Sequence, residues 1–140
     1  MASQYATIQH EWFDRLWNNG DESAIDELLH PECTGHGLTD NEGNEVQGIE
    51  AFRQFYHSFR AAFPDIHIEV LEHVENGDMI AVFCECTATH SGQGFVMPAT
   101  NRQVDFTGQC MVRLKDGKIY DSWNSFDFLR VMQQIGVFSI

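Results

Sequence analysis

The run Asp116-Gly117-Lys118-Ile119-Tyr120-Asp121-Ser122-Trp123-Asn124-Ser125-Phe126-Asp127 decides how this sequence is expected to fold. Its Asp-Gly pair has the chemistry of a tight hairpin turn, and the aromatic residues that follow favour a β-strand. Strand alternation places Asp121, Trp123 and Ser125 on one face. Residues 129–136 then predict a short helix, so Asp127 is expected where the strand gives way to that helix.

Upstream of this run, the sequence predicts more strands joined by tight turns. Residues 75–78 read Glu-Asn-Gly-Asp, a hairpin signal, and residues 91–101 are expected to form a loop. Strands are predicted at 33–38, 66–74, 79–89 and 103–114. Because consecutive strands with tight turns pair with each other, we expect an antiparallel sheet.

Three helices are predicted before the sheet, at residues 3–18, 21–29 and 48–63, each with an apolar stripe at helical spacing. Helices grouped before strands indicate an α+β fold in which the helices cover one face of the sheet. A twisted sheet covered in this way forms a cone, and its open mouth is a natural place for a pocket.

Length and composition narrow the possible functions. The 140 residues are expected to form one domain, 1–140. The net charge of −13, from 21 acids against 8 bases, argues against nucleic acid or an anionic membrane as a partner. Without a signal peptide or a stretch of about 20 apolar residues, the expected location is cytoplasmic. The cysteines, Cys33, Cys84, Cys86 and Cys110, are expected to be free thiols, and their spacing predicts no metal site.

Short motifs spread along nearly the whole chain resemble a known family. Among them are Leu16-Trp17-Asn18-Asn19-Gly20-Asp21, Gly48-Ile49-Glu50-Ala51-Phe52, Ala88-Thr89-His90-Ser91-Gly92 and Gln134-Ile135-Gly136. In this order they resemble the SnoaL-like polyketide cyclase or ester cyclase group of the nuclear transport factor two-like superfamily. The resemblance implies a cone-shaped α+β barrel, with helices on the concave face of a curved antiparallel sheet. It also implies a deep apolar pocket, no cofactor, and a homodimer formed through the sheet.

The resemblance further implies that an acid at the position of Asp127 acts in an intramolecular aldol closure of a small apolar carbonyl compound. One carboxylic acid can give and take the protons if an apolar pocket raises its pKa toward neutrality. Asp127 lies between Phe126 and Phe128, which suits that role. It can equally cap the helix that follows, and the two roles are compatible.

Possible polar partners of this acid are less well defined. His36 lies between two glycines and is predicted either to polarise a substrate carbonyl or to be an edge histidine. His90, at the end of a strand, is predicted to act as a second acid or to order the next loop. Arg113 is expected to hold an enolate or to form a cross-strand ion pair with Glu85; in the cyclases an imidazole stands at about its position.

Aromatic side chains complete the predicted substrate site. Trp123, with Tyr56 and Phe59 from the third helix, forms either the wall of a pocket or a filled core.

Three functions therefore compete. The first is a cofactor-free lyase or isomerase acting on a small apolar carbonyl compound, and the second is a non-catalytic binder of a small apolar ligand. An epoxide hydrolase, the third, needs Arg and Asp two residues apart on one strand, and no such pair occurs here: Arg102 and Asp105 are three apart.

Overall fold

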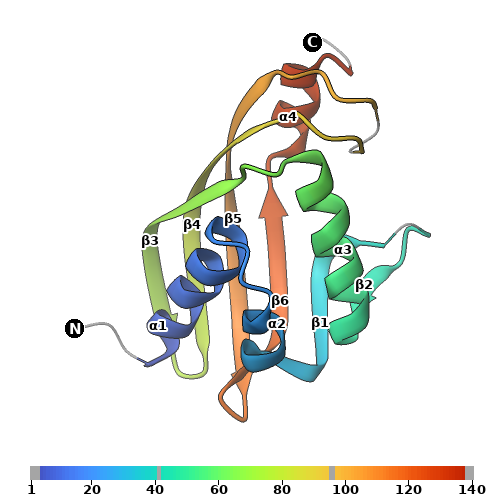
Figure 1. The fold of residues 1–140 in the computed structure, drawn as a ribbon. Helices are drawn as coiled ribbons and strands as arrows, with labels where there is room; N and C mark the ends of the chain where they lie inside the picture. The colour runs from blue at the N-terminus through green and yellow to red at the C-terminus, as the bar shows by residue number, and fades with distance from the viewer. Residues whose placement is uncertain (1–3, 41, 95–96, 138–140) are drawn as a thin grey trace.

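The structure, a computed structural model, describes residues 4–40, 42–94 and 97–137, with side chains from residue 7 onward. Figure 1 shows helices packed against one face of a curved sheet. The helical segments are α1 (Gln4–Glu11), the π-helical η1 (Trp12–Asn18), α2 (Ser23–Leu28), α3 (Gly48–Ala62) and α4 (Phe128–Ile135). The strands are β1 (Leu29–Thr39), β2 (Glu45–Gln47), β3 (His67–Asn76), β4 (Met79–Thr89), β5 (Gln103–Lys115) and β6 (Lys118–Phe126).

The six strands form one sheet in the order β2-β1-β6-β5-β4-β3. The sheet is curved (Figure 1). It is also open, because its edge strands β2 and β3 do not pair with each other. One pair differs from the predicted antiparallel arrangement: β1 and β6 run parallel, with His36 opposite Trp123. Tight turns predict only how sequence neighbours pair, and β1 and β6 come from distant parts of the chain.

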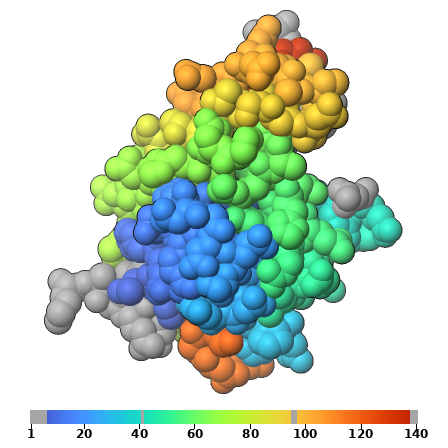
Figure 2. Space-filling model, in the orientation of Figure 1, coloured from blue at the N-terminus to red at the C-terminus, as the bar shows by residue number. Residues whose placement is uncertain are grey.

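The helices cover the concave face, as predicted (Figures 1 and 2). Leu16 and Ile25 have no exposed surface, and Phe63 is 1% exposed. The first predicted helix is continuous but widens into π-helical geometry at Trp12. It ends at Gly20, which has φ +70° and donates its N–H to Leu16 O at 3.1 Å. The predicted cap at Ser3 lies outside the described residues.

The hairpin that leads into β6 forms as predicted. Asp116 and Gly117 both have positive φ, 55° and 75°, as a two-residue turn of this twist requires. On the outer face, which is turned away from the helices, Asp121 and Trp123 lie opposite Arg113 and Met111 of β5. The alternate residues of β6 therefore face the helices.

The cysteines agree with the prediction of free thiols. All four cysteines are free and buried. No described helix combines the length and apolarity needed to cross a membrane. Within the described ranges, no group of three or more His, Cys, Asp or Glu side chains is placed to hold a metal ion.

Candidate functional site

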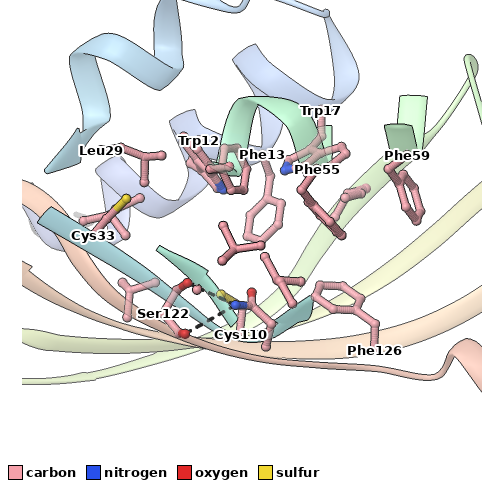
Figure 3. A pocket seen from close by; sticks show the side chains of 18 of the residues that line it. Trp12, Phe13, Trp17, Leu29, Cys33, Phe55, Phe59, Cys110, Ser122 and Phe126 are labelled. Atoms are coloured by element: carbon pink, nitrogen blue, oxygen red, sulfur yellow. Dashed lines mark hydrogen bonds between the residues drawn. The ribbon is translucent and has the colours of Figure 1, made fainter. Parts of the chain in front are cut away.

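A cavity, called the chamber here, lies between the helices and the sheet (Figure 3). Its space open to the centre of a water molecule is about 70 Å³, several times the roughly 10–15 Å³ that one water needs. Its lining is Trp12, Phe13, Trp17, Leu29, Cys33, Thr34, Gly35, Leu38, Val46, Phe52, Phe55, Phe59, Ile66, Ile68, Cys86, Phe106, Cys110, Val112, Ile119, Ser122, Asn124, Phe126 and Phe128.

The helical wall of the chamber is aromatic. Trp17 of η1 packs edge-on against Phe59 of α3, with ring centroids 5.6 Å apart. The ring centroids of Trp12 and Phe52 lie 5.2 Å apart, with the rings tilted. Because edge-to-face and tilted ring pairs restrain one another, these side chains form a fixed apolar surface. Figure 3 shows Phe55 and Phe59 of α3 along this wall.

The sheet floor carries the few polar groups. Ser122 and Asn124 come from β6, and Thr34 comes from β1. Asn124 Nδ2 donates to Ser122 Oγ at 3.0 Å and to the His36 carbonyl at 3.0 Å. The bonds next to Ser122 are drawn in Figure 3. These contacts hold the Asn124 side chain against β1.

The chamber is electrically neutral. No Asp, Glu, Lys, Arg or His is found among the described residues that line it. Burial raises the pKa of Cys86 and Cys110 to about 12 and also raises that of Cys33, so these thiols stay protonated near pH 7. The described lining can therefore bind an uncharged ligand but offers no side chain that titrates near neutral pH.

A second hollow adjoins the chamber and shares Leu38, Phe55, Phe59 and Phe128 with it. It lies between the end of β1, the exposed side of α3 and the start of α4. It has about 410 Å³ open to water. We call this hollow the mouth, because four of its residues also line the chamber.

Asp127 lies at the predicted junction of β6 and α4. Its Oδ1 accepts a hydrogen bond from Arg130 N at 3.1 Å, so the predicted helix cap is present. The residue is exposed and does not line the chamber, although Phe126 and Phe128 on either side of it do. A catalytic role for Asp127 stays a prediction.

His36, Trp123 and Arg113 come together, but on the outer face rather than in the chamber. The His36 ring stacks on Trp123 with centroids 5.2 Å apart and planes at 16°. Its Nδ1 lies 2.8 Å from Glu45 Oε1 and its Nε2 lies 3.1 Å from Asp121 Oδ1. These carboxylates, Glu45 first, raise the pKa of His36. The Arg113 guanidinium lies 5.7 Å from the centre of the Trp123 ring.

The predicted ion pair between Glu85 and Arg113 is wrong. Glu85 is exposed on the outer face, but the register places it opposite Thr107, and Arg113 lies opposite Met79. The six-residue offset along β5 separates the two charges. Arg113 Nε lies instead 3.7 Å from Asp78 Oδ2.

Of the other predicted residues, Phe59 lines both the chamber and the mouth. Tyr56 is buried and donates its hydroxyl to Leu16 O at 3.0 Å, which ties α3 to η1 behind the chamber wall. His90 is fully buried, and its Nε2 donates to Gly94 O at 3.0 Å. Its Nδ1 lies 3.1 Å from Thr100 Oγ1, so the loop-ordering bonds considered for His90 are present.

Sequence reasoning missed Ser122 and Asn124. The signal was available, because the alternation that puts Asp121 and Trp123 on one face of β6 puts these two residues on the other. The sequence did not indicate which of the two faces is turned inward.

Comparisons with known proteins agree with this architecture. The sequence model of the SnoaL-like polyketide cyclase family matches residues 7–135. Aklanonic acid methyl ester cyclase DnrD of Streptomyces peucetius is 30% identical over 121 residues, which cover 86% of this chain and 83% of that protein. Nogalonic acid methyl ester cyclase of Streptomyces nogalater is 27% identical, with 86% and 89% covered.

Solved structures show the same fold. A SnoaL-like protein from Jannaschia sp. CCS1 superposes with a TM-score of 0.86 at 23% identity, covering 96% of this chain and 93% of that one. IdmH of Streptomyces antibioticus superposes with a TM-score of 0.82 at 27% identity, covering 96% and 99%.

Proposed function

Because this chain belongs to the SnoaL-like polyketide cyclase family, we propose that its chamber binds a polyketide-like compound, meaning a small, largely apolar molecule that carries carbonyl groups. The observation that carries the proposal is the chamber itself, with an aromatic wall and a few neutral polar groups on its floor. Flat, unsaturated molecules pack well against such rings, and a neutral lining favours an uncharged ligand.

Ring closure by a cofactor-free aldol reaction is the proposed chemistry, supported by the cyclase activity named for the relatives. The reaction forms one carbon–carbon bond: a base removes a proton next to one carbonyl, the carbanion attacks a second carbonyl, and an acid protonates the new alkoxide. Asp127 is proposed to act as both the acid and the base. It caps α4 and lies next to residues of the chamber lining without belonging to that lining. Binding without turnover is the alternative, and the neutral lining favours it.

A homodimer through the outer face of the sheet is part of the proposal. Four large apolar side chains are exposed there or at its β3 edge: Leu71, Val74, Phe83 and Met111. A grouping of this kind on a soluble protein often marks a contact surface.

The test uses the compounds for which the relatives are named, nogalonic and aklanonic acid methyl esters. Aldol closure conserves mass, so turnover would appear as an isomer of equal mass with a new chromatographic retention time. Binding is measured in parallel by calorimetric titration. The proposal would be refuted if the protein neither bound nor converted the two esters and also failed to bind smaller aromatic ketones.

A matched pair of variants locates the binding site. Phe55→Ala removes a ring from the chamber wall, whereas Phe83→Ala removes an exposed ring from the outer face. We expect the first change to weaken ligand binding about tenfold or more, and the second to leave binding unchanged while weakening the dimer. Equal effects of both changes on binding would contradict the assignment of the chamber.

A further inference from the structure

The chamber floor holds hydrogen-bonding groups that the protein itself leaves unused. The two protons of Asn124 Nδ2 are directed at the His36 carbonyl at 3.0 Å and at Ser122, whose Oγ lies at 3.0 Å and carbonyl at 3.4 Å. The two carbonyl oxygens can only accept, so the carboxamide cannot be turned around without placing its own oxygen against them. Oδ1 of Asn124 therefore has a fixed position, and it accepts no hydrogen bond from any described residue.

Ser122 supplies the complementary group. Its hydroxyl oxygen accepts from Asn124, and its own proton is not donated to any part of the chain that the structure describes. Within those same residues, only Gln9 has fully enclosed side-chain atoms without a partner, so Asn124 Oδ1, which also has no partner, is not fully enclosed. Both residues line the chamber. One free donor and one free acceptor thus lie side by side in an apolar cavity.

The backbone keeps this pair in place. Gly37 has φ +83°, and a Cβ there would lie 2.1 Å from the Asn124 carbonyl oxygen. The end of β1 is therefore packed directly onto β6 at this point. A polar pair held by two strands needs little reorganisation to receive a ligand.

From this geometry we infer that Ser122 and Asn124 form an anchor for one hydroxyl group, the phenol or enol of an otherwise apolar ligand; the inference rests on the proposed function of the chamber. A hydroxyl complements both groups, since its proton is donated to Asn124 Oδ1 and its oxygen accepts from Ser122. A ketone or an ether can only accept. A cavity that hydrogen-bonds a hydroxyl discriminates strongly against an analogue that lacks it.

Three naphthalenes of nearly equal shape test the anchor. 2-Naphthol offers a donor and an acceptor, 2-methoxynaphthalene only an acceptor, and 2-methylnaphthalene neither. We expect 2-naphthol to bind the wild-type protein about tenfold more tightly than the methoxy compound, as one additional buried hydrogen bond implies. Calorimetric or fluorescence titration gives the three dissociation constants.

The same substitution on opposite faces of β6 provides the control. Ser122→Ala removes the donor in the chamber, and Ser125→Ala changes an exposed serine on the outer face. We expect Ser122→Ala to weaken 2-naphthol binding about three- to tenfold, with no effect on 2-methylnaphthalene. Ser125→Ala should change neither. Asn124→Leu should abolish the preference for 2-naphthol, provided that circular dichroism shows a folded chain.

The outcomes separate the two proposals. If all three naphthalenes bind and Ser122→Ala leaves their ratios unchanged, the anchor is refuted while the chamber remains a binding site. If none of them binds, and the two polyketide esters do not bind either, the proposed function fails and the anchor fails with it.

Discussion

Replacing Asp127 by asparagine and by alanine separates its two predicted roles. Asparagine is as good a helix cap as aspartate, but it cannot exchange a proton near neutral pH. Alanine can do neither. In the structure, Asp127 Oδ1 accepts one hydrogen bond from Arg130 N at 3.1 Å, at an exposed site. The pair of variants therefore removes the charge alone, or the charge and the cap together.

The expected cost follows from that one bond. Loss of an N-cap destabilises a protein by about 1 kcal/mol, within a range of roughly 0.5–2, which for a chain of this size lowers Tm by about 3–5 °C. Helix α4 should stay docked in both variants, because Asp105 holds it independently: its Oδ1 accepts from Gln134 Nε2 at 2.6 Å and from Arg130 Nη2 at 3.1 Å. We expect Asp127→Asn to cost only a few tenths of a kcal/mol.

Urea unfolding of the three proteins gives the free energies, and turnover of the methyl esters gives the activities. If Asp127 is the acid, both variants lose turnover although Asp127→Asn remains as stable as the wild type. If it is only a cap, Asp127→Asn keeps its turnover. An Asp127→Asn protein destabilised as much as Asp127→Ala would refute the hydrogen-bonded cap on which this reasoning depends.

Three further predictions concern stability. Carboxylates, that of Glu45 first, raise the pKa of His36 in the folded state. The wild type should therefore be more stable than His36→Gln below about pH 6.5, the pKa of an unfolded histidine, and lose this advantage as the pH rises through the higher pKa of the folded state. A difference in free energy of unfolding, measured by urea titration, that stays constant with pH would contradict this. Gln9 has no exposed surface, and its carboxamide makes no hydrogen bond of normal geometry to any described residue. It lies near enough to Cys110 to offset part of the rise in pKa that burial gives that thiol. Gln9→Met should therefore raise the free energy of unfolding by about 1–2 kcal/mol, and a loss of stability would show that the amide has a partner, such as buried water. Gly37→Ala should cost more than about 2 kcal/mol, whereas Gly43→Ala, with the same φ of +83° and open space, should cost about 1; equal costs would refute the close contact with Asn124.

The sequence was sufficient for most elements, because their signals are local. The helix at 48–63 has a wide apolar face and begins at a glycine, and the structure forms α3 there. The strand at 79–89 has the predicted bounds, since buried and exposed residues alternate along it. In contrast, β2 has only three residues, too few to show a period, and the sequence predicts no element there.

The sequence does not indicate which face of β6 is turned inward, and the prediction therefore placed Trp123, an outer-face residue, in the pocket. One face carries Asp121, Trp123 and Ser125, and the other carries Ser122, Asn124 and Phe126. Each has one aromatic and two polar residues, so hydrophobicity does not distinguish them. The choice is made by tertiary contacts: the outer face meets the charged partners of β5 and β1, and the helices cover the other. Local pattern carries no information about those contacts.

The absence of charged side chains from the described chamber lining bears on the choice between catalysis and binding without turnover. The chain has 21 acidic residues, yet none of the described residues lining the chamber is acidic, so a compound fully enclosed there meets no protein base. Asp127 lies beside the chamber, between two phenylalanines that do line it, and the mouth contains Phe128 and Met132 of α4. A compound confined to the chamber meets these two rings rather than the Asp127 carboxylate, which lines neither hollow. Turnover by Asp127 should therefore require an extended substrate, whereas a short aromatic ligand should bind without reacting.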